Sequence, residues 1–483
     1  MKKLWLLAAA VVVTLLVACA PVSQSLDEPI RVLYVGQNPD TVEGYSYGGN
    51  RADNAKLIKT KAAEYMAFLN QHFDATLVYG EAYKPEMSAN YDVTVFDALP
   101  MELDGKDMTD SERYGYASPH AGWRWLPNDF NHATIFVAGP LTNMGPSLSL
   151  TMGTLCNCLD KTAFKFDESH PIFSSPNKVP LDYVETPYAG GVFNYYSGRN
   201  LPKKIPMLRM EVDDPQGLSL PPGLVTVPGT GDSPDTEYIS GGTCIKSVNA
   251  VAIARHGNFL QWGFRSSPVH MTEAAKLAFI NAVHYIKPFK GAKRLVAKKS
   301  AHRLAAMDAP YKLSDQGWAV QLENHNKANA VLQGQYDRVQ AGTGSEQDKM
   351  MVKLLGKPKA LDRSRFVKSI PKSLQQEFGE DWNRYLAYYE ANMGYLYASE
   401  GYQFAFDADA QQLGIANNNP AILDRSIALL EQGDQVELAQ RVLARYTTQQ
   451  FETPQQWRQW FDSNQDKLFF TEVGGYKFMV NTL

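Results

Sequence analysis

Histidines are the first candidates for chemistry in this chain, because their charge changes near neutral pH. There are nine, and His120, His170 and His256 each have a proline or glycine as a neighbour. A histidine in such a place more often hydrogen-bonds its own turn than a ligand. The alternative is general acid–base catalysis with Asp or Glu, which makes these three the candidate catalytic residues. No His-x-x-x-His or Cys-x-x-Cys pair has metal-site spacing, so we expect no metal and no cofactor.

The cysteines other than Cys19 are Cys156, Cys158 and Cys244. Three is an odd number, and their spacing is not that of a disulfide framework. A bridge between Cys156 and Cys158 closes a very small ring, which disulfide geometry tolerates poorly; pairing of Cys244 with either one stays open. As a nucleophile Cys156 needs an accessible, electropositive setting. Its leucine neighbours instead favour small buried apolar residues.

Two segments, 118–130 and 188–199, combine aromatic rings with amide and guanidinium groups. Flat rings can cover the apolar faces of a sugar while the polar groups hydrogen-bond its hydroxyls. The other interpretation is that the rings pack these loops onto the core. We predict one common cleft lined by the four rings at positions 123, 125, 195 and 196. The candidate ligand-binding residues are Trp123, Arg124, Trp125, Tyr195, Tyr196 and Arg199.

Two further loops carry weaker signals. The acidic loop 228–237 offers carboxylates for Ca2+ but lacks EF-hand spacing, so a solvated loop is expected. The glycine-containing loop 36–54 holds no Gly-x-Gly-x-x-Gly, so the dinucleotide-binding fingerprint is absent.

Alternating strands and helices must position these groups. Short β-branched runs predict strands at 31–36, 75–79, 91–97 and 133–139, and apolar residues spaced by three and four predict a helix over 52–71. Parallel neighbours need crossover connections of this length. The sequence therefore predicts an α/β fold with a doubly wound parallel sheet, whose ligands bind at the carboxyl ends of the strands.

The end of this region has a recognisable order of elements. Two strands, 247–254 and 259–264, flank a turn at 256–258, and a helix follows Thr272. This block, together with His-Pro-Ile-Phe at 170–173, resembles the trehalose-utilisation (ThuA-like) branch of the class I glutamine amidotransferase-like superfamily, over residues 30–288. The resemblance implies a flavodoxin-like sheet and, in active amidotransferases, a cysteine nucleophile on a tight turn after a central strand. The corresponding turn, 138–142, has no cysteine, so we expect no glutaminase activity.

The N-terminus resembles a bacterial lipoprotein signal. Two lysines precede an apolar run from Leu4 to Ala18, and Leu-Val-Ala-Cys at 16–19 resembles a lipobox, in which Cys19 carries the lipid. A cleaved soluble signal or a simple anchor is the alternative. Ala20 after the cysteine resembles the pattern of lipoproteins sorted to the outer membrane. We therefore expect a protein of the cell envelope, anchored by its N-terminal lipid.

The composition changes after Pro288. The predicted organisation is a signal peptide (1–18), a tether (19–29), an amidotransferase-like α/β domain (30–290), a basic linker (291–300) and a mainly α-helical C-terminal domain (301–483). Residues 422–446 predict two helices broken at Gly433, and a further helix should follow Pro371. The helical domain is expected to pack against or bind a partner protein.

Composition and charge limit the function without identifying it. With 44% hydrophobic residues the chain is too apolar to be disordered, and a net charge of −4 gives no reason to bind nucleic acid. The first hypothesis is that the ThuA-like domain binds a sugar or related small metabolite. The second is a carbohydrate-modifying, hydrolase-like enzyme that uses His and carboxylate groups in the strand-end cleft. Whether the protein is an enzyme stays open.

Overall fold

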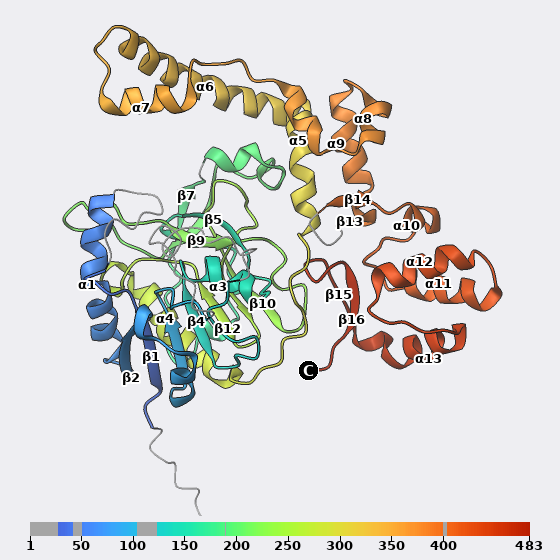
Figure 1. Cartoon of the computed structure of the whole chain (residues 1–483), viewed down its shortest axis with the longest axis horizontal. Coiled ribbons are helices and arrows are strands. Elements are labelled where there is room, and N and C mark those ends of the chain that lie inside the picture. The colour runs from blue at the N-terminus through green and yellow to red at the C-terminus, as the bar shows by residue number, and fades with distance from the viewer. Residues whose placement is uncertain (1–27, 42–50, 104–122, 189, 399–402) are drawn as a thin grey trace, which may run out of the picture.

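The computed structural model describes residues 28–41, 51–103, 123–188, 190–398 and 403–483. In these residues an α/β domain lies beside a helical region that extends along one side of it (Figure 1). The predicted α/β fold followed by a helical region is confirmed.

The first half of the central sheet is parallel. Its strands follow the order β2 (Asp74–Tyr79), β1 (Arg31–Gly36), β3 (Val93–Phe96), β4 (Thr134–Val137) and β12 (Phe259–Trp262). Each pair is parallel, with Val32 opposite Val93 and Thr94 opposite Thr134. The chain leaves β2 on one side of β1 and returns as β3 on the other. This reversal makes the gap between β1 and β3 a topological switch point.

The second half of the sheet is antiparallel and extends the predicted one. It begins with the hairpin that joins β12 to β11 through Gly257, whose φ of +55° is accessible to glycine without strain. The strands are β11 (Val251–His256), β10 (Thr236–Gly242), β6 (Thr162–Phe164), β8 (Lys204–Arg209) and β7 (Tyr183–Pro187), with β5 (Thr154–Leu159) and β9 (Gly223–Thr226) paired beside β11.

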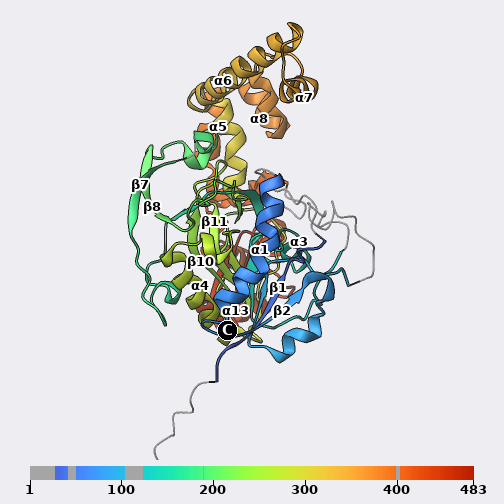
Figure 2. The ribbon, with the colours of Figure 1, turned by 90° about the vertical axis from the view of Figure 1, so that its left-hand side faces the viewer.

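Helices cover both faces of the parallel half. On one face α1 (Arg51–Leu69) and α4 (Glu273–Ile286) pack in one core cluster with Val32, Val95 and Val137. On the other, α3 (Leu141–Ser147) packs with Val35 and Phe136. Figure 2 shows α1 in front of β1 and β2. Thr272 caps α4 by accepting a hydrogen bond from the Ala275 N–H, as the sequence predicted.

The helical region contains nine α-helices among the described residues. Gly433 ends α11 in the left-handed conformation, as predicted, whereas the single helix predicted after Pro371 is two helices broken at Gly379, which has a φ of +54°. Two hairpins, β13 (Leu396–Ala398) with β14 (Phe404–Phe406) and β15 (Leu468–Thr471) with β16 (Lys477–Val480), complete the region. The helices are α5 (Asp308–Leu313), α6 (Asp315–Gln340), α7 (Glu346–Leu355), α8 (Lys372–Phe378), α9 (Trp382–Ala391), α10 (Ala408–Leu413), α11 (Ala421–Gln432), α12 (Val436–Tyr446) and α13 (Pro454–Asn464).

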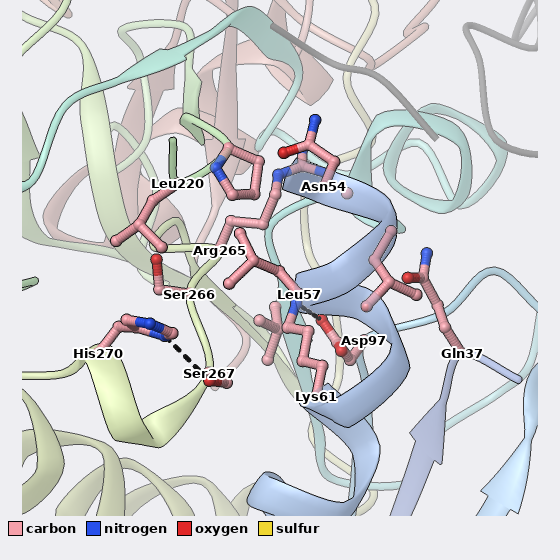
Figure 3. A pocket seen from close by; sticks show the side chains of 14 residues that line it. Gln37, Asn54, Leu57, Lys61, Asp97, Leu220, Arg265, Ser266, Ser267 and His270 are labelled. Carbon is pink, nitrogen blue, oxygen red and sulfur yellow. Dashed lines mark hydrogen bonds and ion pairs between the residues drawn. The ribbon is translucent and has the colours of Figure 1, made fainter. Parts of the chain in front are cut away.

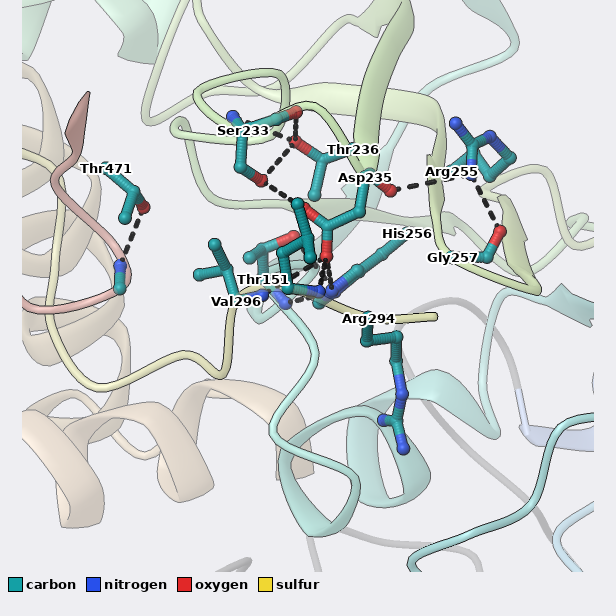
Figure 4. A network of polar contacts seen from close by, with 12 residues as sticks. Thr151, Ser233, Asp235, Thr236, Arg255, His256, Gly257, Arg294, Val296 and Thr471 are labelled. Atoms are coloured by element: carbon teal, nitrogen blue, oxygen red, sulfur yellow. Dashed lines mark hydrogen bonds and ion pairs between the residues drawn. The ribbon is translucent and has the colours of Figure 1, made fainter. Parts of the chain in front are cut away.

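The segment 291–300 is held against the α/β domain rather than running free as a linker. Arg294 donates to the Leu148 carbonyl, and the Lys298 N–H donates to the Ser149 carbonyl. Asp235 accepts hydrogen bonds from the backbone N–H groups of Leu295 and Val296 (Figure 4).

The acidic loop 228–237 makes the second connection between the two parts. Asp232 accepts hydrogen bonds from the Glu472 and Val473 N–H groups, next to the β15–β16 hairpin. The expectation of a solvated loop is therefore wrong for Asp232 and Asp235, because their carboxylates satisfy backbone donors of the C-terminal part. No helix among the described residues combines the length and apolar character needed to cross a membrane.

Candidate functional site

A narrow cleft opens at the carboxyl ends of the parallel strands. Gln37 follows β1, Asp97 follows β3 and Gly139 follows β4, and all three line it. Its far wall is the loop after β12, with Arg265, and Figure 3 shows this loop facing α1 across the cleft. We call it the strand-end cleft. Its volume is about 40 Å3, which is room for about three water molecules. The position at the β1–β3 switch point is the usual ligand site of such sheets.

A buried ion pair forms the floor of the strand-end cleft. Lys61 on α1 donates to Asp97 at 2.6 Å, and their side chains are only 12% and 2% exposed. The Tyr34 hydroxyl also donates to Asp97, at 2.8 Å. Burial lowers the pKa of Lys61, although the nearby Asp97 charge opposes the shift. Asp97 therefore fixes both groups at the end of β3.

Arg265 and Glu211 connect the cleft to a second cavity of about 360 Å3. Arg265 donates to the Pro222 carbonyl at 3.0 Å and to the Asn157 side chain at 3.3 Å. Glu211 lines the second cavity and accepts the Ser266 N–H at 2.9 Å. Burial raises the pKa of Glu211, against the opposing effect of the Ser266 hydrogen bonds. The region thus contains a cation and a carboxyl group whose pKa is raised by burial.

The turn between β4 and α3 has the shape of a nucleophile elbow without a nucleophile. Ala138 follows the strand directly and has a φ of +49°. Residues other than glycine rarely adopt this left-handed conformation. Such a strained strand-to-helix turn presents the nucleophile in α/β-hydrolases. Here the side chain is a methyl group, next to Val137 and Gly139 of the cleft.

We predict that the protein releases no ammonia from glutamine. Ala138 offers neither thiol nor hydroxyl, and Cys156 is bound in a disulfide. A coupled ammonia assay on the purified chain should stay at the level of the buffer blank, and Cys156→Ala should leave that level unchanged. Glutamine-dependent ammonia release that the Cys156→Ala variant loses would contradict this prediction.

His170 and His256, the two candidate histidines that the structure describes, lie at the amino ends of the parallel strands, away from the cleft. His256 ends β11 opposite Phe259, and Phe259 begins β12 opposite Thr134, the first residue of β4. His170 contacts Glu237, which is paired with Arg255 near the same strand ends. They therefore do not meet in the strand-end cleft, which corrects the prediction that they serve chemistry there. His120 lies outside the described residues.

Hydrogen bonds give both histidines a structural role. The Ile172 N–H donates to Nδ1 of His170, and the Thr151 N–H donates to Nδ1 of His256. Because Nδ1 of each ring accepts a backbone N–H, Nε2 is the nitrogen that donates to a carboxylate. The acceptors are Glu237 at 3.4 Å and Asp235 at 3.2 Å.

His270 is the histidine of the strand-end cleft, and sequence reasoning missed it. It ends the short 3-10 helix η7 (Pro268–His270) in the loop after β12. Its Nε2 lies 2.8 Å from Asp214 Oδ2, and its Nδ1 lies 3.3 Å from the Ser267 Oγ. The signal that could have found it is its position a few residues after the predicted strand 259–264, since β12 is parallel to β4 and ends at the cleft.

The four predicted rings do not share a cleft. Trp123 lines a cavity of about 760 Å3 together with Arg124 and Arg294, whereas Trp125 is fully buried beneath it. The two tryptophan rings meet edge to face with centroids 6.5 Å apart. This pair belongs to the core on the α3 face of the sheet.

The tyrosines lie elsewhere, against the helical region. Tyr195 lines a separate cavity of about 290 Å3, and Tyr196 is buried against Tyr311 of α5. The Arg199 guanidinium stacks 3.6 Å from the centre of the Tyr196 ring and pairs with Glu390 at 3.3 Å. The predicted common cleft is therefore wrong, and Tyr196 and Arg199 instead join the two parts of the chain.

The cysteines form one cluster, with Cys156 and Cys158 on β5 and Cys244 in the loop after β10. Cys156 and Cys158 are joined by a disulfide with their Cα atoms 5.2 Å apart, and the Cys244 Sγ lies 3.4 Å from the Cys158 Sγ. The expectation that the small ring disfavours this bridge is wrong, because β5 is irregular on both sides of Cys156 and brings the alternate residues closer. Among the described residues these three sulfurs are the group placed to hold a metal ion. The disulfide removes two of the thiolates that such a site needs.

The comparisons with known proteins leave the family open. No family model matches the chain, and no curated protein matches it. The ThuA-like resemblance therefore stays a prediction from the residues that suggest it.

Proposed function

We propose that the α/β domain binds a sugar or a related small hydroxylated metabolite across the strand-end cleft and the adjoining cavity of about 360 Å3, which shares Leu220 and Pro221 with it. The observation that carries the proposal is the composition of this cleft at the switch point. Leu57, Ile58 and Leu220 supply aliphatic walls, and Arg265 and the Lys61–Asp97 pair supply donors and acceptors. Small-molecule sites combine such apolar walls with a few fixed polar groups.

A second candidate function is a carbohydrate-modifying, hydrolase-like enzyme. One observation favours it, namely that His270 lines the cleft while it pairs with the Asp214 carboxylate. A histidine held by a carboxylate is the usual arrangement of a general base.

Thermal unfolding with glucose, N-acetylglucosamine and glucuronate tests the binding proposal. A sugar that binds should raise Tm in a saturable way, by about 5 °C when its concentration is about a hundred times Kd. Arg265→Gln should remove this rise, and Arg384→Gln, which breaks an exposed pair with Glu377 in the helical region, should keep it. A rise that survives Arg265→Gln, or no rise with any of the three sugars, would overturn the proposal.

We also propose that the chain is anchored in the cell envelope through a lipid on Cys19, on the strength of the lipobox-like 16–19 segment. Cys19→Ala should move the protein from the membrane fraction to the soluble fraction, because a single acylated residue supplies the anchor. Mass analysis of the N-terminal peptide checks this. An unmodified N-terminus cut at another position would refute the anchor.

A further inference from the structure

We propose that Ser267, His270 and Asp214 form a nucleophile, base and positioning residue that hydrolyse short acyl esters in the strand-end cleft. The inference rests on the proposed function for its substrate class, an acylated sugar or similar alcohol. It adds a reaction and the residues that perform it.

The geometry is that of a hydrogen-bonded relay. The Ser267 Oγ lies 3.3 Å from Nδ1 of His270, and Nε2 of His270 lies 2.8 Å from Asp214 Oδ2. Asp214 is held in turn, because its Oδ1 accepts the N–H groups of Gln216 and Leu218. All three members of the relay are fixed, as nucleophilic catalysis requires.

The other histidine–carboxylate pairs in the described part of the chain show why this one differs. His170, His256 and His302 each accept a backbone N–H at Nδ1, from Ile172, Thr151 and Leu304 respectively. In all three rings Nδ1 is therefore occupied by a backbone donor, and at His256 the Thr151 hydroxyl also lies 3.3 Å from it. At His270 the partner of Nδ1 is a hydroxyl, which can donate its proton to the ring. Of these four, His270 alone contacts a hydroxyl that lines the strand-end cleft.

The cleft limits the acyl group to a short one. Its volume of about 40 Å3 holds about three water molecules, which matches the three non-hydrogen atoms of an acetyl group. Leu57 and Leu220 suit the methyl, and Arg265 supplies positive charge on the same wall as Ser267. The larger neighbouring cavity, which shares Leu220 and Pro221 with the cleft, leaves room for the alcohol part.

The reaction balances with water as its only co-reactant. The Ser267 Oγ bonds to the ester carbon while its proton passes to Nδ1 of His270. The bond from that carbon to the alcohol oxygen then breaks, and the alcohol leaves with the proton from Nδ1. Water gives a proton to the same nitrogen, attacks the acyl-Ser267 ester and releases the carboxylic acid, and Ser267 regains its proton.

Hydrolysis of p-nitrophenyl acetate by the full chain tests the relay. Ser267→Ala and His270→Gln should each lower kcat/KM on the order of a thousandfold. His170→Gln, which removes a buried histidine–carboxylate contact at the opposite edge of the sheet, should leave it unchanged. p-Nitrophenyl hexanoate should be cleaved at least tenfold more slowly than the acetate.

Asp214→Asn tests positioning. It should lower kcat and move the acid limb of the pH–rate profile to lower pH, because the imidazolium loses its carboxylate partner. A merely structural role would leave the profile in place.

Covalent labelling gives a readout that does not depend on turnover. A fluorophosphonate should add its mass to the peptide that carries Ser267, and Ser267→Ala should abolish the adduct. Hydrolysis that persists in Ser267→Ala, or an adduct only at other serines, would overturn the relay. If glucose, N-acetylglucosamine or glucuronate still raises Tm in that case, the binding proposal stands while the hydrolysis fails. If hydrolysis depends on Ser267 but none of these sugars raises Tm, the hydrolysis stands and the binding proposal fails.

Discussion

Replacing Asp97 with alanine is expected to destabilise the folded chain by about 3 to 5 kcal/mol, because it leaves a buried charge without its partner. Lys61 is only 12% exposed, and its amino group lies 2.6 Å from the lost carboxylate. Tyr34, which is fully buried, loses the acceptor of its hydroxyl at the same time. Urea unfolding followed by circular dichroism measures the change.

The chain offers a matched control at the other end of the same strand. Asp92 immediately precedes β3 and pairs with Arg31 at 3.9 Å, where the two side chains are 27% and 52% exposed. Asp92→Ala should cost about 1 kcal/mol, since an exposed pair contributes little and the exposed Arg31 N–H that Asp92 accepts at 2.8 Å can hydrogen-bond to water instead. Lys61→Met combined with Asp97→Ala should recover part of the Asp97→Ala loss, because both buried charges are then gone. Equal losses from Asp92→Ala and Asp97→Ala would show that the pair is not a buried one in solution.

The parallel half of the sheet could be read from the sequence because its strands are buried on both faces. Val93–Phe96 and Thr134–Val137 are buried at every position, so the chain shows them as short runs of β-branched and aromatic residues. The edge strand Tyr183–Pro187 is mostly exposed and contains Glu185, Thr186 and Pro187, so it carried no such signal. Burial on both faces is thus what made a strand predictable here.

The site was harder to predict because its members gain their roles from partners distant in sequence. Trp125 is buried and Trp123 lines a cavity, although the two are separated by one residue in the same loop. The backbone donor that fixes His256 is Thr151, which is 105 residues away. His270 meets Asp214 across 56 residues. A side chain's type and its local turn do not determine such contacts, which depend on the register of strands and loops.

Removing the Asp235 carboxylate, which lies beside His256 at the other end of the strands, is expected to lower the free energy of unfolding about as much as Asp97→Ala. Asp235 is 1% exposed in its side chain and accepts hydrogen bonds from Ser233 and His256 as well as two backbone N–H groups of the 291–300 segment. Asp235→Ala should cost about 3 to 5 kcal/mol, since several buried donors lose their acceptor together. The exposed Asp182→Ala is a suitable control and should change the free energy of unfolding by less than about 0.5 kcal/mol.

The Asp235 carboxylate should also make the stability of the folded chain depend on pH. Comparison with Asp235→Asn separates the effect of its charge from the effect of its shape. Burial alone would raise its pKa, but the hydrogen bonds from His256, Ser233 and Leu295 lower the pKa of Asp235 to about 2. A pKa depressed on folding stabilises the folded state above the unfolded pKa, and this stability is lost as the pH falls from about 4 to 2. The native chain should therefore lose about 2 kcal/mol more than Asp235→Asn over this interval. Parallel acid unfolding curves for the two proteins would show that Asp235 is not held as a carboxylate, and that the 291–300 segment is attached to the domain by other contacts.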